Sequence, residues 1–228
     1  MTLQLDDVEV RYGDHVAVHP VSMTLPAGAL VAVTGPSGAG KTSLLWATCR
    51  AVTRGNGEVT VDGRAIGTHD DALDAGVVLI PQGNGLARVL TATENILLPL
   101  MARRGRPAEE ATARETAAGA LAAVGMAESH AHLVEELSGG QQQRVAVARG
   151  LAQRASVLLA DEPTSELDAT NRDVVLALLR AEADRGAVVV LATNDLDAVR
   201  VCDAHATLHE GRLTWERGLE RAGPRHRA

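Results

Sequence analysis

A short apolar run that leads directly into a glycine-rich loop constrains this fold more than any other feature. Residues 29–33 read Ala-Leu-Val-Ala-Val, and residues 35–42 read Gly-Pro-Ser-Gly-Ala-Gly-Lys-Thr. Residues 41–52 then lack glycine and proline, which is typical of a helix. A buried strand that turns through glycines into a helix is a building unit of parallel sheets. We therefore predict an α/β fold around a mostly parallel sheet.

The glycine-rich loop has the composition of an anion site. Glycines let the backbone curl so that successive N–H groups face phosphate oxygens, and the start of a helix adds partial positive charge. In such a loop Lys41 reaches the β- and γ-phosphates of a nucleotide, and Thr42 offers its hydroxyl to Mg²⁺. A chance match to this pattern, in the strand–helix context that its chemistry requires, is rare. The loop predicts nucleotide binding.

Further apolar runs predict the other strands. Alternating apolar residues from Leu3 to Val10 indicate a strand that ends near Tyr12. A strand and turn are expected at 57–63, and buried strands at 77–80, 157–160 and 188–191, with a helix near 170–185. This alternation of strand and helix supports a sheet that is covered on both faces.

The composition changes after about residue 83. Residues 107–124 are rich in alanine and glutamate, and Pro107 stands at a suitable first helical position. We predict a helical lobe over about 83–149, between two parts of a core at about 1–82 and 150–216. The chain shows no repeat and no low-complexity linker, so we expect a single domain over 1–228.

The charge and hydropathy of the chain exclude several classes of protein. Its net charge of −7 argues against a nucleic-acid binder. No apolar run approaches the roughly 18–20 residues needed to cross a bilayer, and the N-terminus lacks the pattern of a secretion signal. Cys49 and Cys202 stand in apolar contexts without metal-ligand spacing, which predicts buried thiols. The basic tail at about 217–228 is expected to be solvated and frayed, with anionic-lipid binding as the alternative.

Two later segments add chemistry to the loop. Asp161 and Glu162 follow the apolar run at 157–160, where one carboxylate can hold Mg²⁺ through water and the other can polarise an attacking water. Taken alone, such a pair is also an ordinary acidic strand end. Leu137-Ser138-Gly139-Gly140-Gln141 precedes a helical run to about Ala148, and a serine with glycines at a helix start permits close approach of an anion.

These three elements, in this order, resemble the nucleotide-binding subunit of ATP-binding-cassette (ABC) transporters over about residues 3–215. The resemblance implies the ABC ATPase fold, a P-loop NTPase with a RecA-like core, an antiparallel β-subdomain and an inserted α-helical subdomain. It implies in-line attack of water on the γ-phosphate of MgATP, with Glu162 as general base and Asp161 as a magnesium ligand. The implied contacts of the loop with ATP are made by Gly35, Pro36, Ser37, Gly38, Ala39, Gly40, Lys41, Thr42 and Ser43.

The resemblance also implies a dimer. In this family the signature residues, here Ser138, Gly139, Gly140 and Gln141, contact ATP that is held by the other subunit, so two cassettes close around ATP at their seam. Ser165-Glu166-Leu167-Asp168 resembles the D-loop, in which Asp168 helps the two subunits to communicate. A homodimer is favoured over a heterodimer with a different cassette.

Two further residues match positions around the nucleotide. Gln82 follows Ile80-Pro81 and resembles the Q-loop glutamine, which senses Mg²⁺ and the γ-phosphate. Tyr12 is the only tyrosine and stands where the family stacks an aromatic ring on adenine, a contact worth roughly 1–3 kcal/mol per base. A tyrosine that packs locally at the strand end is the alternative.

One position departs from the family. Leu191-Ala192-Thr193-Asn194-Asp195 matches the switch segment, which normally carries histidine where this chain has Asn194. Asparagine can donate a hydrogen bond to phosphate, but it is shorter and has no protonatable ring. Losing one transition-state contact typically costs about 2–4 kcal/mol, or about 10²–10³ in rate, so we expect slow hydrolysis. The alternatives are that Glu162 suffices, or that the chain is a degenerate regulatory cassette paired with an active one.

The resemblance finally implies a membrane permease as partner. The segment from Gln82 to Leu100 matches the surface where a permease helix docks, which would hold the chain at the inner face of the cell membrane. Residues 93–100, Thr-Glu-Asn-Ile-Leu-Leu-Pro-Leu, look like the subfamily of lipoprotein release, macrolide efflux and cell division. Ribosome-acting relatives usually carry two cassettes, and DNA-repair relatives carry a long coiled coil, so the length disfavours both.

Overall fold

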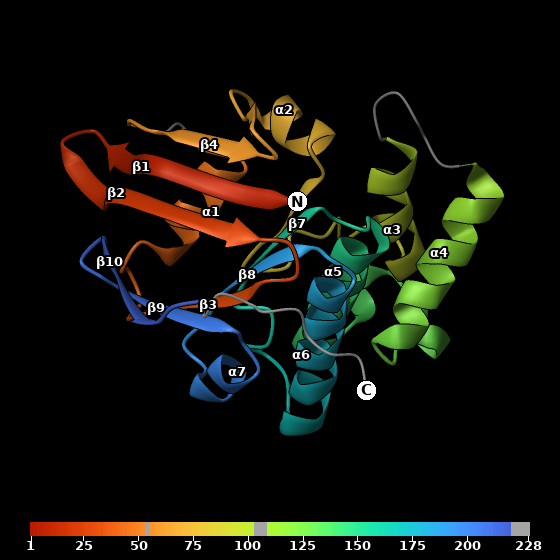
Figure 1. Ribbon diagram of the computed structural model, residues 1–228. Coiled ribbons are helices and arrows are strands. Elements are labelled where there is room, and N and C mark those ends of the chain that lie inside the picture. Colours follow the sequence, from red (N-terminus) through yellow and green to blue (C-terminus); the bar gives the residue numbers. More distant parts are fainter. Residues whose placement is uncertain (53–54, 103–108, 220–228) are drawn as a thin grey trace, which may run out of the picture.

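The main sheet has six strands in the order β10-β9-β3-β8-β7-β6 (Figure 1). The computed structural model describes residues 1–52, 55–102 and 109–219. Strands β9, β3, β8, β7 and β6 are parallel, and β10 adds an antiparallel edge. The strands are β3 (Leu30–Thr34), β6 (Val77–Ile80), β7 (Val157–Asp161), β8 (Val188–Ala192), β9 (Ala204–His209) and β10 (Arg212–Arg217). Every residue of β3, β7 and β8 is buried, as expected for central strands covered on both faces.

A second sheet of four strands lies above the main sheet in Figure 1, in the order β2-β1-β4-β5. Its strands are antiparallel: β1 (Thr2–Tyr12), β2 (His15–Pro26), β4 (Glu58–Val61) and β5 (Arg64–Ala65). The short helix α2 (His69–Asp74) follows it and begins with a capping box between Thr68 and Asp71. The N-terminal strand is therefore the middle of a small antiparallel layer.

Alternate residues of the central strands belong to two different hydrophobic cores. Val31 and Val33 of β3 pack with helix α1 (Lys41–Thr48) and with the apolar face of the four-stranded sheet. Leu30 and Ala32 point the other way and pack with the helices on the opposite face. Helix α1 therefore fills the space between the two sheets, and this holds the glycine-rich loop at its N-terminus in place.

The helices of the opposite face are α3 (Ala92–Met101), α4 (Glu110–Ala123), α5 (Gly139–Ala152) and α6 (Ala169–Asp184). Two single-turn 3₁₀ helices, Ala127–Ser129 and Val134–Glu136, connect α4 to α5, and α7 (Leu196–Arg200) joins β8 to β9. In Figure 1, α3 and α4 lie at one side of the molecule, with α5 between them and the sheet. No helix among the described residues is both long and apolar enough to cross a membrane.

Some boundaries differ from those predicted. Helix α1 ends at Thr48 rather than at Val52, because Arg50 takes a left-handed conformation with φ of 57°. Arg217 is not part of a frayed tail: it ends β10 and donates to the carbonyl of Cys202 at 2.6 Å. Pro107 and the arginines after residue 219 lie outside the described residues. Cys49 and Cys202 are buried free thiols, as predicted.

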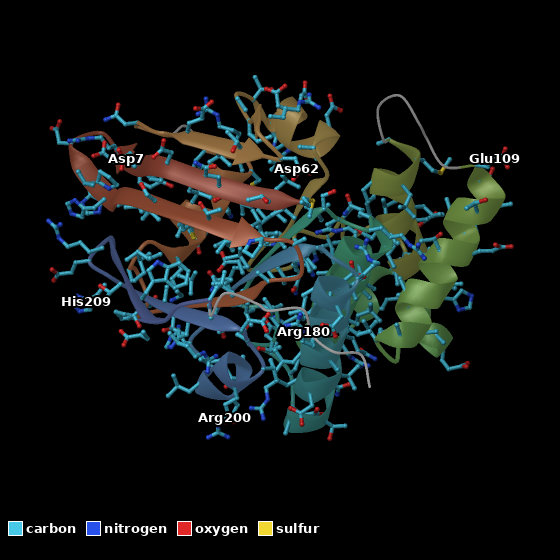
Figure 2. All side chains as sticks on the ribbon, in the orientation of Figure 1. Asp7, Asp62, Glu109, Arg180, Arg200 and His209 are labelled. Atoms are coloured by element: carbon cyan, nitrogen blue, oxygen red, sulfur yellow. The ribbon has the colours of Figure 1, made fainter. Side chains whose placement is uncertain are left out.

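Most charged side chains are exposed or partly exposed, and Glu9, Lys41 and Asp161 are the buried exceptions among the described residues. Figure 2 shows Glu109 and Arg200 at the edges of the molecule. Arg180 differs, because it joins α6 to the sheet through Asp203 at 2.7 Å and the carbonyl of Gly28 at 2.9 Å.

Candidate functional site

A cleft of about 180 Å³ lies at the carboxyl ends of β3, β6, β7 and β8. In parallel sheets these ends meet at one edge, where ligands bind. The cleft brings together residues that were expected from the sequence to act at a nucleotide or at Mg²⁺: Ser37, Gly38, Ala39, Gly40, Lys41, Thr42, Ser43, Gln82, Asp161, Glu162 and Asn194. The lining residue that was missed is Ala17, which belongs to β2, a strand that the sequence did not reveal.

The glycine-rich loop leaves the start of α1 open. Gly40 is the N-cap with φ of 104°, and a Cβ at this position would overlap the carbonyl oxygen of Ala17. Glycine is therefore required by both conformation and space. No side chain caps α1 and no acidic residue stands in its first turn. The first amides of the helix thus face the cleft without a competing acceptor from a cap, which suits a phosphate group.

Lys41 gathers three oxygen atoms around its ammonium. Its Nζ donates to the carbonyl of Gly35 at 2.6 Å, to that of Pro36 at 3.3 Å and to Oδ1 of Asn194 at 3.0 Å. The carboxylate of Glu162 lies 3.9 Å away. The Lys41 side chain is only 8% exposed. A nearly buried cation at the start of an uncapped helix makes this corner of the cleft attractive to an anion.

Glu162 is held in an unusual backbone conformation. Its φ of 48° is left-handed, which costs a non-glycine residue energy and often marks a functional site. Its Oε2 accepts hydrogen bonds from the Thr193 hydroxyl and from the backbone amide of Asn194, each at 3.3 Å. The carbonyl of Glu162 accepts from Nε2 of Gln143 at 2.7 Å, so helix α5 also fixes this turn. The carboxylate is thereby aimed into the cleft beside Lys41.

Asp161 carries a buried carboxylate whose two oxygens have no hydrogen-bond partner among the described residues. The residue is 1% exposed. Burial raises the pKa of this carboxyl, and the nearby Thr42 hydroxyl and Lys41 ammonium oppose the shift only in part; the hydroxyl does not reach full hydrogen-bond geometry. An unsatisfied carboxylate next to a hydroxyl is an oxygen donor set of the kind that Mg²⁺ prefers, so these residues fit that ion.

Tyr12 stands at the mouth of the same region. It is 49% exposed, and its hydroxyl donates to Oγ of Ser43 at 3.3 Å, which joins the end of β1 to the first turn of α1. An aromatic ring this exposed beside the phosphate loop is available to a flat ligand group. The contact places Tyr12 near the cleft, although the residue does not line it.

The signature residues do not line the cleft of their own chain. Ser138 is instead the N-cap of α5. Its hydroxyl accepts a hydrogen bond from the backbone amide of Gln141, and the side-chain oxygen of Gln141 accepts one from the backbone amide of Ser138. Asp168 likewise caps α6 through the amide of Asn171 at 2.8 Å. Both groups of residues are thus built as helix starts away from the cleft.

The contacts that hold Glu162 in place were not expected from the sequence. Gln143 of α5 binds the carbonyl of Glu162, and its Oε1 accepts from the Glu166 amide at 2.7 Å. Thr193 connects Glu162 to Asp195, whose amide donates to the Thr193 hydroxyl at 3.0 Å. Thr193 lies in the switch segment and Gln143 follows the signature, but neither motif indicates these contacts, which form only when the fold brings the distant Glu162 near.

The cleft, the uncapped phosphate loop and the acidic strand end are the features by which this chain can be classified. A family model described as ABC transporter matches residues 18–165, and the chain belongs to this family. The matched range contains the loop, Gln82, the signature and Glu162, and it ends before Asp168 and Asn194.

Full-length relatives and solved structures agree with this assignment. The lipoprotein-releasing system ATP-binding protein LolD of Maricaulis maris is 39% identical over 224 residues, which are 93% of this chain and 96% of LolD. The glutamine transport ATP-binding protein GlnQ of Escherichia coli is 35% identical over 217 residues, which are 92% of this chain and 89% of GlnQ. The dimeric structure of MJ0796, a bacterial ABC transporter cassette, matches with a TM-score of 0.87 and 29% identity, over 95% of this chain and 99% of MJ0796. The predicted ABC ATPase fold is therefore confirmed.

Proposed function

We propose that this chain is the ATP-binding and hydrolysing subunit of an ABC transporter. The observation that carries the proposal is the convergence of Lys41, Asp161 and Glu162 on one cleft at the end of the parallel strands. Relatives that are named as ATP-binding proteins of transport systems support it. ADP and Pi are bound in the post-hydrolysis dimer of MJ0796, which matches with a TM-score of 0.85 and 28% identity.

The geometry suggests how the chain's residues divide the chemistry. The open start of α1 and the Lys41 ammonium would bind the phosphates, and Tyr12 would stack on the base. Glu162 would accept the proton of the attacking water, because its carboxylate reaches the cleft beside Lys41. Asp161, with Thr42 and Gln82, would hold Mg²⁺, which when bound neutralises charge on the phosphates.

We further propose that two copies form the working unit. The signature residues start α5 away from their own cleft, so they are free to meet the nucleotide of a second subunit. Asp168 at the start of α6 would contact the same seam. The dimeric MJ0796 cassette supports this arrangement. A homodimer needs no second gene product, and both halves of the site are present in this chain, so we favour it over a heterodimer.

Asn194 gives the proposal its sharpest test. Its amide side chain lies 3.0 Å from Lys41, beside the position proposed for the γ-phosphate, so it is placed to act in hydrolysis. We expect the wild-type chain to turn over slowly and Asn194→His to raise kcat by at least about tenfold. The measurement is steady-state MgATP hydrolysis across protein concentrations.

Two other results are possible. The first would count against a role of Asn194 in hydrolysis, and the second would count against turnover in the natural chain. A wild-type rate that rises with the square of concentration, and that histidine does not improve, would show that Glu162 suffices without a histidine. A wild-type rate near background that Asn194→His restores would instead favour the alternative of a degenerate cassette that binds ATP and closes, or that waits for an active partner. Asn194 is the only residue that supports this alternative, because Lys41, Asp161 and Glu162 are all placed in the cleft.

Tyr12 gives a prediction about binding alone. We expect Tyr12→Ala to weaken ATP binding by about tenfold, because stacking on a base is worth roughly 1–3 kcal/mol, with little change in kcat. Tyr12→Phe is the matched control: it removes the hydrogen bond to Ser43 and keeps the ring. Equal losses in both variants, measured by calorimetric titration with ATP, would assign the effect to the hydroxyl instead of to stacking.

We propose that a membrane permease docks over the segment from Gln82 to Leu100. This segment exposes Val89 at 74% and Leu98 at 52%, which are large fractions for apolar side chains. Docking there would place the chain at the cytoplasmic face of a membrane, with the region of about 83–149 moving as a unit on the core. The choice of subfamily stays a prediction, because LolD and GlnQ belong to different transport systems and have similar identities.

A further inference from the structure

The loop after Gln82 has an unusual left-handed backbone. Gly83, Asn84 and Gly85 have φ values of 75°, 68° and 55°, so three successive residues are left-handed. Glycine and asparagine are the residues that tolerate this conformation. The turn closes on itself through the Asn84 amide to the Pro81 carbonyl at 3.3 Å and the Gly85 amide to the Gly83 carbonyl at 2.8 Å. The carbonyls of Asn84 and Gly85 take no part in these two bonds.

Arg149 of helix α5 binds both of these carbonyls. Its Nη1 donates to the Gly85 oxygen at 2.6 Å and its Nη2 donates to the Asn84 oxygen at 2.8 Å. A planar guanidinium presents two donors side by side, which matches two neighbouring carbonyls as an ammonium would not. The loop is thus held by the side chain of a residue that lies 64 positions after Gly85 in the sequence.

Arg149 is balanced by backbone carbonyls and not by a carboxylate. None of the ion pairs found among the described residues involves it. Burial lowers the pKa of its guanidinium, although an arginine remains charged. A partly buried cation that is balanced only by carbonyl dipoles favours the loop conformation that presents those carbonyls, and any other conformation would leave the charge less well satisfied.

Helix α5 also carries the signature residues at its start. Ser138 caps the helix, Gln143 holds the carbonyl of Glu162, and Arg149 holds the loop after Gln82. A helix of 14 residues is a stiff rod of about 21 Å. One rigid element therefore starts at the proposed dimer seam and, along its length, contacts the backbone that follows the neighbouring strands β7 and β6.

We propose that Arg149 is a positioning residue that fixes the loop after Gln82 to helix α5, so that Gln82 and the signature end of α5 move together. The proposal rests on the proposed function, in which Gln82 senses the nucleotide and Ser138 contacts the second subunit. Loss of the Arg149 contact would leave the loop attached to α3 by Asn95, whose side chain binds both the amide and the carbonyl of Ala87. The movement of Gln82 would then be coupled to that of the signature only indirectly, through α3.

The test compares Arg149→Gln with Arg144→Gln in the full-length chain. Arg144 is a matched control, because it lies on the same helix and also donates to two carbonyls, those of Val124 and Gly125, which are remote from the cleft. We expect Arg149→Gln to lower kcat by about tenfold while the affinity of the phosphate loop for ATP changes less than about twofold. Arg149→Lys should recover only part of kcat, and Arg144→Gln should keep kcat within about twofold of wild type.

Hydrogen exchange of residues 82–87 gives a second readout that does not depend on activity. We expect the amides of this loop to exchange at least about fivefold faster in Arg149→Gln and to be unchanged in Arg144→Gln. If the wild-type chain fails to hydrolyse MgATP, the proposed function is wrong, and hydrogen exchange alone then decides whether Arg149 fixes the loop.

A variant on the loop side covers the case in which Arg149→Gln does not fold. A Cβ at Gly85 would lie 2.9 Å from Cγ of Pro81 and 3.5 Å from Nη2 of Arg149, so Gly85→Ala strains the same contact without removing the cation. It should reproduce the loss of kcat and the faster exchange. Variants at 149 and 85 that both behave like Arg144→Gln would overturn the proposal.

Discussion

Glu162→Gln is expected to lower steady-state MgATP turnover by about a thousandfold, within the range of a lost general base. The amide has nearly the shape of the carboxylate, so it can keep the contacts with Thr193 and the Asn194 amide, but it cannot accept a proton from water. The substitution also removes a negative charge 3.9 Å from the Lys41 ammonium, which leaves that cation freer for phosphate. Binding of ATP should therefore be kept or strengthened.

This separation of binding from turnover can be measured directly. With MgATP, Glu162→Gln should accumulate as a dimer in light scattering, because ATP at the seam is not consumed. Glu216→Gln, an exposed glutamate on β10, is the matched control and should turn over like the wild type. Turnover within about tenfold of wild type in Glu162→Gln would contradict the assignment of Glu162 as general base.

The central sheet was predictable because its strands are buried on both faces. The runs at 77–80, 157–160 and 188–191 are apolar without interruption, and they correspond to β6, β7 and β8. Strand β2 was missed for a physical reason. Val16 and Val18 belong to one phase of alternation and Val21, Met23 and Leu25 to the other, with His19 and Pro20 between them. A register irregularity in the pairing with β1 accommodates this change of phase. As a result the apolar residues of β2 do not alternate regularly along the sequence, and the strand cannot be recognised from its pattern.

The candidate site likewise contains some residues that could be proposed from the sequence and others that could not. Residues such as Lys41 and Thr42 could be proposed from the sequence because phosphate and metal chemistry demand fixed residue types at fixed spacing, and the structure brings most of the proposed residues together in one cleft. Gln143 and Arg149 could not be found in this way, because each binds backbone carbonyls and amides. A backbone group has no identity in the sequence, so its partner is visible only after the fold brings the two together.

Asp161→Asn is expected to stabilise the chain and to inactivate it. The carboxylate is buried, both of its oxygens lack partners, and burial raises its pKa, so the folded protein carries an unfavourable charge at neutral pH. Removing that charge should raise the free energy of unfolding by about 1 kcal/mol without nucleotide, which is about 2–4 °C in Tm for a chain of this size. MgATP turnover should fall by at least about a hundredfold, because the proposed metal site loses its buried charge.

The difference in Tm between the wild type and Asp161→Asn is expected to depend on pH. Because the folded-state pKa of Asp161 is raised above the ordinary value of about 3.9, the folded chain keeps this proton at a pH where the unfolded chain has lost it. The protonated carboxyl contributes to the free energy of unfolding. This contribution is fully present below the ordinary pKa, and it is lost as the pH rises through the folded-state pKa. The wild type should thus fall progressively behind Asp161→Asn in Tm across this window and stay behind above it.

A surface aspartate separates this effect from a general effect of charge. Asp173 on α6 is 72% exposed, and Asp173→Asn should change the stability by less than about 0.5 kcal/mol at any pH. A lower Tm for Asp161→Asn than for the wild type at pH 7 would show that the carboxylate is stabilised in the folded chain. Unchanged turnover would remove Asp161 from the proposed magnesium site. A gain in stability with a loss of activity identifies a residue whose charge is kept for a ligand and is unfavourable for the fold.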